Sequence, residues 1–297
     1  MTTETLSALF PCPICGRRTD QELFPDSLDG QLPSFGYNFS PHQMKTYRFV
    51  LCRSCHHGYA SPRPMELWKS YTEVEDPAYL VRQPERLLTA QRVLPRVRRY
   101  VPAGRLLDVG CATGDFLSAA QALYEVEGVE LSAWAAAIAE QRGLTIYRCR
   151  LEHVTPQTSY DVVTLWGVIE HFEDPAREVR AMHRLLRPGG IVALWTGDVD
   201  SWLARLLKQR WWYVMGQHLQ LFSRQSLRAL FVSQGFQELW VGRYPYVATA
   251  ASITASLSRY RGIGPLMGRL LHLPFIAQRS MTLHIPGEMF AVFRKVS

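Results

Sequence analysis

Residues 106–117, LLDVGCATGDFL, decide the fold of this 297-residue chain. Apolar residues surround Asp108 and then give way to Gly110 and Gly114, which is the pattern of a buried strand that ends in a tight turn before a helix. Beyond this turn, further strands are expected near 124–132, 144–150, 160–171 and 191–197, with helices between them. Such alternation predicts an α/β fold with a parallel sheet and helices on both of its faces.

The carboxyl-terminal part continues the alternation with one interruption. Residues 223–236 predict a helix with Ser223 as its N-cap, and 237–244 and 288–296 predict two final strands. An apolar insert broken by glycine and proline, 246–285, separates these strands. Before the first strand of the sheet, residues 65–100 have a helical pattern in which Pro84 and Pro95 are expected to start or break helices.

The glycine turn and its acid indicate the ligand. Parallel sheets bind ligands at the carboxyl ends of their strands, and a dinucleotide-binding loop holds a pyrophosphate there. Here Asp108 precedes the glycines, so the turn repels phosphate and attracts a cation. Glu130, at the end of the next strand, suits the two hydroxyls of a ribose. These residues predict a nucleoside with a positive charge and no phosphate, which describes S-adenosylmethionine.

Four stretches in this order resemble the successive motifs of class I S-adenosylmethionine-dependent methyltransferases: LLDVGCATGDFL, VEGVELS, YDVVTLWGVIEHFEDP and LLRPGG. The resemblance covers about residues 104–240, and Ala112 departs from it where the family often has glycine. It implies a Rossmann-like sheet, mostly parallel with an antiparallel last strand. It also assigns the cofactor to Asp108, Gly110, Cys111, Ala112, Gly114, Glu130 and Leu131. Glu152 meets the adenine or is a surface acid, and Trp166 packs on the cofactor or in the core.

The four cysteines of CPIC and CRSC predict a metal site. Cys12, Cys15, Cys52 and Cys55 form two C-x2-C pairs, and two such pairs can complete a four-thiolate zinc shell. A closed shell leaves no open position, so the zinc is expected to be structural. The 36 residues between the pairs are more than a common zinc ribbon has, so the chain must leave the site and return. The segment resembles the zinc-binding front end of many bacterial methyltransferases.

Candidate acceptor residues lie before, within and after these motifs. His171 ends the fourth strand and His218 precedes the late helix, and either suits a general base or a histidine that orders a loop. Tyr71 and Tyr79 fall where related enzymes cover the cofactor or acceptor. Trp211, Trp212 and Tyr213 form an aromatic cluster that walls an acceptor pocket or belongs to the core. GQHLQLFSRQSLRALFVSQGF resembles a segment of small-molecule and glycan methyltransferases.

The predicted organisation is a zinc-ribbon-like segment (1–63), a helical linker that covers the cofactor (64–103) and a methyltransferase domain (104–297). The predicted activity is methyl transfer from S-adenosylmethionine to a small-molecule, sugar or glycan-precursor acceptor, with oxygen favoured. The alternatives are an rRNA or tRNA methyltransferase whose zinc ribbon binds RNA, and a non-enzymatic zinc-ribbon interaction protein. No stretch is long and apolar enough to span a membrane, and no secretory signal is visible, so a cytoplasmic location is expected.

Partners follow from charge and composition. The formal net charge of +7 fits a solvated surface, an acidic ligand or an anionic lipid surface. A nucleic-acid partner is not expected, because basic and aromatic residues are not interleaved. Four arginines dot the apolar insert 246–285, which makes peripheral membrane contact through it an expectation: Arg259, Arg261, Arg269 and Arg279. The sequence does not indicate the oligomeric state.

Overall fold

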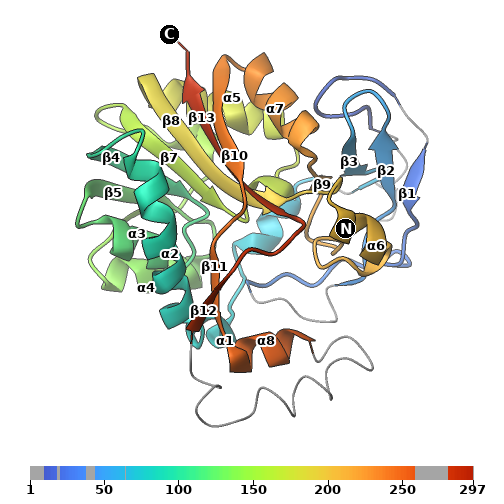
Figure 1. The fold of residues 1–297 in the computed structure, drawn as a ribbon, viewed down its shortest axis with the longest axis horizontal. Helices are drawn as coiled ribbons and strands as arrows, with labels where there is room; N and C mark the ends of the chain where they lie inside the picture. Colours follow the sequence, from blue (N-terminus) through green and yellow to red (C-terminus); the bar gives the residue numbers. More distant parts are fainter. Residues whose placement is uncertain (1–9, 19–20, 38–43, 64, 258–279, 297) are drawn as a thin grey trace.

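The computed structural model describes residues 10–18, 21–37, 44–63, 65–257 and 280–296 (Figure 1). Its centre is a seven-stranded sheet in the order β10 (Phe236–Gly242), β13 (Glu288–Lys295), β8 (Leu186–Gly197), β7 (Tyr160–Trp166), β4 (Gly104–Val109), β5 (Tyr124–Val129) and β6 (Thr145–Tyr147). Only β13 is antiparallel to its neighbours. The predicted Rossmann-like sheet is therefore confirmed.

Helices cover both faces of this sheet (Figure 1). They are α2 (Gln83–Arg98), α3 (Asp115–Ala120), α4 (Ala133–Gln141), α5 (Pro175–Leu185) and α7 (Arg224–Ser233). Side chains alternate between the faces along a strand. Leu106 of β4 joins the apolar cluster that includes Val97 of α2. Leu107, the next residue, joins the cluster that includes Met182 of α5. The apolar run of β4 is thus buried on both sides, as expected for a central parallel strand.

Helix boundaries partly follow the local sequence signals. Ser223 caps α7 with a capping box, as predicted, and Pro84 lies in the first turn of α2. The expectation that Pro95 starts or breaks a helix is wrong, because Pro95 lies inside the last turn of α2. Near a helix end it removes one intrahelical hydrogen bond, and burial of Val93, Leu94 and Val97 holds the helix together.

The amino-terminal part forms a second sheet that also includes a strand from far along the chain. Its order is β1 (Glu22–Phe24), β2 (Phe49–Cys52), β3 (His57–Ala60) and β9 (Gln220–Leu221). Phe49 packs in one apolar cluster with Trp211 and Leu219. The amino-terminal segment is therefore fixed on the methyltransferase fold by both backbone pairing and apolar contact. The domain boundaries at 63 and 103 stay predictions.

The remaining described elements surround the carboxyl end of the central sheet. They are α1 (Pro77–Leu80), α6 (Trp202–Leu207), the antiparallel pair β11 (Tyr246–Thr249) and β12 (Ser280–Leu283), α8 (Ala250–Leu257), and 3₁₀ turns at Leu67–Tyr71, Leu151–His153, Ile169–His171 and Lys208–Arg210. The centre of the predicted insert, with its four arginines, lies outside the described residues. Within the described ranges no helix has both the length and the apolar character to cross a membrane.

Candidate active site

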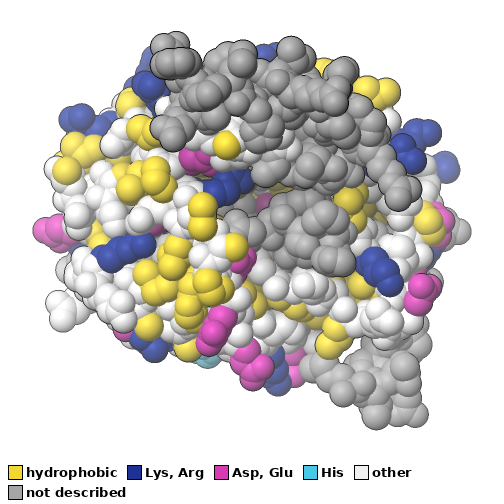
Figure 2. All heavy atoms as spheres, turned by 90° about the horizontal axis from the view of Figure 1, so that it is seen from below, with side chains coloured by type: hydrophobic (Ala, Val, Ile, Leu, Met, Phe, Trp, Pro, Cys, Tyr) yellow, Lys and Arg dark blue, Asp and Glu magenta, His cyan; other side chains and the backbone are white. Residues whose placement is uncertain are grey.

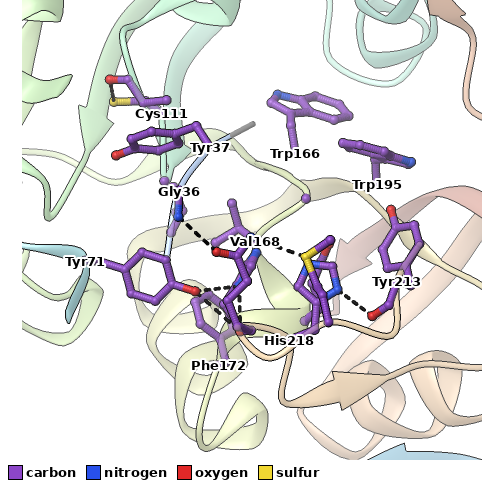
Figure 3. A pocket seen from close by; sticks show the side chains of 18 of the residues that line it. Gly36, Tyr37, Tyr71, Cys111, Trp166, Val168, Phe172, Trp195, Tyr213 and His218 are labelled. Atoms are coloured by element: carbon purple, nitrogen blue, oxygen red, sulfur yellow. Dashed lines mark hydrogen bonds between the residues drawn. The ribbon is translucent and has the colours of Figure 1, made fainter. Parts of the chain in front are cut away.

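A cavity of about 1820 Å³ opens at the carboxyl ends of β4, β5 and β7. Ordinary ligand pockets have volumes of about 300–1,000 Å³, so this one has room for two ligands side by side. Thirteen of the predicted site residues line it: Tyr71, Tyr79, Asp108, Gly110, Cys111, Ala112, Glu130, Leu131, Trp166, His171, Trp212, Tyr213 and His218. The sequence motifs thus converge on one cavity, part of which is drawn in Figure 3.

The turn after β4 has a backbone that suits close approach by a ligand. Gly110 has a φ of 67°, and a Cβ there would lie 2.7 Å from Cγ2 of Val168. Gly114 has a φ of 79°, and a Cβ there would lie 2.4 Å from Leu144. Ala112 adopts a left-handed φ of 48°, which costs an alanine more than a glycine. The two glycines thus let the turn beside Asp108 pack closely on Val168 and Leu144.

Glu130 lies at the end of β5 and is 5% exposed. Its Oε1 accepts hydrogen bonds from the Ser132 amide (2.8 Å) and the Tyr37 hydroxyl (3.0 Å), and Oε2 accepts one from the Ala112 amide (2.8 Å). A carboxylate has about four acceptor positions, so one position remains on Oε2. Burial raises the pKa of Glu130, and these three donors counter the shift.

Tyr37 is a pocket residue that sequence reasoning missed. It belongs to the long excursion between the two cysteine pairs, and its ring packs on Tyr79 at a centroid distance of 5.0 Å. Its amide donates to Asp76, and the Gly36 amide donates to Gln217 (Figure 3). The unusual spacing of the cysteines indicated that the chain leaves the metal site and returns. It did not indicate that this segment reaches Glu130, the predicted ribose-binding acid.

Asp108 is 2% exposed and accepts a hydrogen bond of 2.6 Å from the Thr164 hydroxyl. Burial raises the pKa of Asp108 to about 8, and the hydrogen bond from Thr164 opposes that shift. A cationic ligand beside Asp108 would favour its ionised form. The predicted role of Asp108 beside a cationic ligand stays a prediction.

The two candidate bases, His171 and His218, lie together with their rings 4.6 Å apart. His171 Nδ1 is 2.9 Å from the Gln217 carbonyl, and His218 Nδ1 is 2.8 Å from the Tyr213 carbonyl (Figure 3). Because a carbonyl only accepts, these contacts favour the tautomers with the proton on Nδ1 and a lone pair on Nε2. Burial lowers the pKa of His171 to about 4 and lowers that of His218 well below its usual range. Both rings are therefore neutral bases near pH 7.

Two further side chains complete the surroundings of the histidines. The Tyr71 hydroxyl is 2.7 Å from His171 Nδ1. Glu170 offers a carboxylate oxygen within 4.8 Å of a ring nitrogen of each histidine, and it accepts a hydrogen bond from Thr196. Burial raises the pKa of Glu170 to about 8. The predicted residues Tyr71, His171 and His218 are thus brought into one cluster.

Three predicted site residues are not among those that line the cavity. Gly114 packs against Leu144 behind the loop. Glu152 pairs with Arg150 at 3.0 Å and also with Arg177. Trp211 is fully buried in the apolar cluster shared with the amino-terminal sheet, whereas its neighbours Trp212 and Tyr213 reach the cavity.

The four cysteines form a compact group on the amino-terminal sheet. The Sγ atoms of Cys12 and Cys55 are 3.6 Å apart, those of Cys15 and Cys52 are 3.5 Å apart, and all four lie within 4.8 Å of one another. A tetrahedral shell with Zn–S bonds of about 2.3 Å places sulfurs about 3.8 Å apart. All four are free thiols rather than disulfides, so their geometry fits a zinc ion.

Comparison with known proteins agrees with this geometry. A family model described as "Methyltransferase domain" matches residues 79–239. The ubiquinone biosynthesis O-methyltransferase of Pseudomonas aeruginosa is 36% identical over 101 residues, which are 31% of this chain and 44% of that protein. The probable tRNA methyltransferase 9B of Mus musculus is 29% identical over 123 residues, 39% of this chain and 27% of that protein. The chain therefore spans less than half the length of these curated relatives.

Solved structures show the same fold. A crystal structure of an S-adenosylmethionine-dependent methyltransferase from Archaeoglobus fulgidus aligns with a TM-score of 0.52 and 16% identity, over 74% of this chain and 100% of that one. The family model covers more than half of the residues, and the fold and the motifs agree with it. The chain therefore belongs to the methyltransferase-domain family, with the fold of the class I S-adenosylmethionine-dependent methyltransferases.

Proposed function

We propose that this protein transfers a methyl group from S-adenosylmethionine to an oxygen of a small-molecule acceptor, such as a sugar or glycan precursor. One observation carries the proposal: the loop after β4, the acid at the end of β5 and two neutral histidines all line a single cavity. A non-enzymatic interaction protein has no need of this combination.

The cofactor end of the cavity supports the choice of donor. S-adenosylmethionine would supply an electrophilic methyl group bound to a sulfonium. Glu130 would bind the ribose through its remaining acceptor position, and Asp108 would balance the positive charge. Leu131 and Trp166 line the same cavity and would pack against the nucleoside. Positioning of donor and acceptor in line contributes about 7–11 kcal/mol to such transfers.

The histidine cluster supports oxygen as the receiving atom. A hydroxyl must lose its proton during transfer, and a positioned base contributes about 10²–10⁴-fold. His171 and His218 each offer a lone pair on Nε2, and their Nδ1 hydrogen bonds hold the rings in place. The name of the Pseudomonas aeruginosa relative, an O-methyltransferase, points the same way. We favour His171 as the base, with His218 as the acceptor-binding residue or second candidate.

A small molecule fits the acceptor end better than RNA does. The acceptor end is lined by the buried acids Glu170 and Glu288, and within the described residues no Lys or Arg pairs with either of them, so nothing there attracts a phosphate backbone. In Figure 2, Lys and Arg are scattered among Asp and Glu over the visible described surface rather than gathered in a stripe. RNA-binding surfaces depend on clustered basic residues. The mouse relative keeps tRNA as the second candidate acceptor.

We also propose that the four cysteines hold one structural zinc ion. Four thiolates leave no open position for a substrate, so the ion would stabilise the segment rather than take part in methyl transfer. The spacing of the four sulfurs supports the proposal, since all four lie within 4.8 Å of one another. Membrane contact through the insert 246–285 stays a prediction, because its central residues lie outside the described ranges.

The decisive experiment uses S-adenosylmethionine with a labelled methyl group. The protein is incubated with a panel of hydroxylated small molecules and sugars, and in parallel with total tRNA and rRNA. We expect label in one class of small molecule, and we expect the His171→Asn variant to lose it while still binding S-adenosylhomocysteine. Label found in RNA alone would favour the second candidate, and failure to bind S-adenosylhomocysteine would refute the proposed activity.

A further inference from the structure

The acceptor end of the cavity contains a carboxylate to which no motif assigned a role. Glu288, at the start of β13, is 7% exposed and lines the cavity. Its Oε1 accepts a hydrogen bond from the indole N–H of Trp212 and its Oε2 accepts one from that of Trp195, both at 3.1 Å. Two of about four acceptor positions are thus used, and two remain.

The surroundings of Glu288 are aromatic. Trp195 stacks on Tyr244 with ring centroids 4.6 Å apart and an interplanar angle of 12°. Tyr213 packs edge-on to Trp195, and Figure 3 shows its hydroxyl pointing toward that ring. All four aromatic side chains around the carboxylate line the cavity: Trp195, Trp212, Tyr213 and Tyr244. These four residues are called the aromatic box below, and Glu288 lies beside two of them, Trp195 and Trp212.

One polar group of this box, the Tyr213 hydroxyl, has no hydrogen-bond partner among the residues that the structure describes. Tyr213 is 3% exposed. A buried hydroxyl without a partner costs about 1–3 kcal/mol, which a ligand can recover by pairing with it. The wall of this part of the cavity thus contains an unpaired hydroxyl and a carboxylate with two free acceptor positions.

The charge balance around Glu288 is the second incomplete feature of this part of the cavity. Within the described residues, Glu288 has no Lys or Arg partner, and Glu170 nearby has none either. Burial raises the pKa of Glu288 to about 7, against the lowering effect of the Trp212 and Trp195 donors. The neighbouring His171 and His218 are neutral, so they supply no positive charge. A buried carboxylate without a counter-charge is costly unless a ligand brings one.

We propose that Glu288 and the aromatic box around it bind a protonated amine of the acceptor. The carboxylate would accept N–H hydrogen bonds from the ammonium group, and the surrounding aromatic side chains would keep water away and so strengthen the ion pair. The acceptor is therefore a compact molecule that carries an ammonium group as well as the atom that receives the methyl group. This inference rests on the proposed methyl transfer and narrows its acceptor class.

The anchor and the base are separate but close. Tyr213 lies between them, with its ring centroid 5.3 Å from that of His218 and 6.4 Å from that of Trp195. A protonated amine has no lone pair, so the nitrogen held by Glu288 would not be the methyl acceptor. A hydroxyl on the same molecule would then face the histidines.

Two probes of the same shape test the charge preference: benzylammonium and benzyl alcohol. Calorimetry is done on protein saturated with S-adenosylhomocysteine, at a pH where Glu288 is ionised and the amine is protonated. We expect the wild type to bind benzylammonium about tenfold or more tightly than benzyl alcohol, because only the cation pairs with the carboxylate. The Glu288→Gln variant should lose this preference. Glu140→Gln, which alters an exposed acid on α4 that is not among the residues lining the cavity, should keep it.

Equal binding of the two probes by the wild type, or a preference that persists in Glu288→Gln, overturns the inference. If Glu288→Gln fails to bind S-adenosylhomocysteine, Tyr213→Phe replaces it. That variant should bind both probes several-fold more weakly, and unchanged affinity would count against the site. A wild type that binds S-adenosylhomocysteine but shows no amine preference leaves the proposed methyl transfer intact. One that does not bind it refutes both.

Discussion

The number of hydrogen-bond acceptor positions left free on Glu130 predicts how strongly a Glu130→Gln substitution weakens cofactor binding. Oε1 already accepts two hydrogen bonds and Oε2 accepts one, so a single position on Oε2 is left for a ribose hydroxyl. In Glu130→Gln, the amide oxygen can keep the two bonds of Oε1, while the NH₂ group replaces Oε2. The NH₂ group can accept neither from the Ala112 amide nor from the ribose, so the variant loses two hydrogen bonds to a charged acceptor. The Ala112 bond is lost with and without cofactor, and loss of the ribose bond costs about 1.5–3 kcal/mol of binding, or about 10–150-fold in affinity.

The assay is calorimetric titration with S-adenosylhomocysteine. Glu140→Gln is the matched control, because Glu140 is an exposed acid on α4 that pairs with Arg148. The Tyr37→Phe variant tests whether the Tyr37 hydroxyl and the ribose use different acceptor positions on Glu130. The hydroxyl uses a position on Oε1 and the ribose would use the free one on Oε2, so removal of the hydroxyl should leave the affinity for S-adenosylhomocysteine nearly unchanged. Tighter binding by Tyr37→Phe would mean that Tyr37 competes with the ribose. A Glu130→Gln effect below about threefold would refute Glu130 as the ribose acid.

Three further outcomes are expected. Purified protein should contain one zinc per chain, and Cys52→Ser should lose the metal and make the amino-terminal sheet sensitive to protease, because metal binding contributes folding energy; a metal-free protein with a resistant amino terminus would contradict this. His171→Asn keeps an N–H for the Gln217 carbonyl but removes the base, so turnover should fall about 10²–10⁴-fold with little change in S-adenosylhomocysteine affinity, whereas retained turnover would make it a loop-ordering residue. Burial raises the pKa of Asp108 to about 8, so between about pH 4 and 8 the unfolded chain has released this proton while the folded protein still holds it. The unliganded protein should therefore lose stability as the pH rises through that range, by an amount on the order of a few kcal/mol, and Asp108→Asn should remove this loss. Denaturant titrations in which Asp108→Asn and the wild type show the same pH dependence would refute the assignment.

The central sheet was predictable because its signals are local. The glycine turn, the capping serine of α7 and the alternation of strands with helices each lie within a few residues of one another. The carboxyl ends of parallel strands meet at one edge, so strand order alone brought Asp108, Glu130 and His171 to one cavity. The pairing of β9 with β3 was not predictable, because it joins segments about 160 residues apart through only two strand residues.

The residues that line the site were harder to predict, because burial decides whether a side chain belongs to the core or to the cavity. Trp211 and Tyr213 are two positions apart, yet one is core and the other lines the cavity. Glu152 follows β6 as predicted, but arginines of α5 and of its own turn pair with it. Tyr37 and Glu288 reach the cavity from the two ends of the described chain, where no motif surrounds them. Long-range placement of this kind depends on packing that a sequence pattern does not encode.

The place of β13 in the sheet has a consequence for the order of events during translation. This strand is near the carboxyl end of the sequence but lies between β8 and β10, and it starts with Glu288 (Figure 1). A ribosome adds about 5–20 residues per second, so the rest of the sheet emerges several seconds or more before this strand does. Until then the edge of β8 is open, β10 has no neighbour to pair with, and a nascent chain exposes apolar surface that a chaperone would recognise.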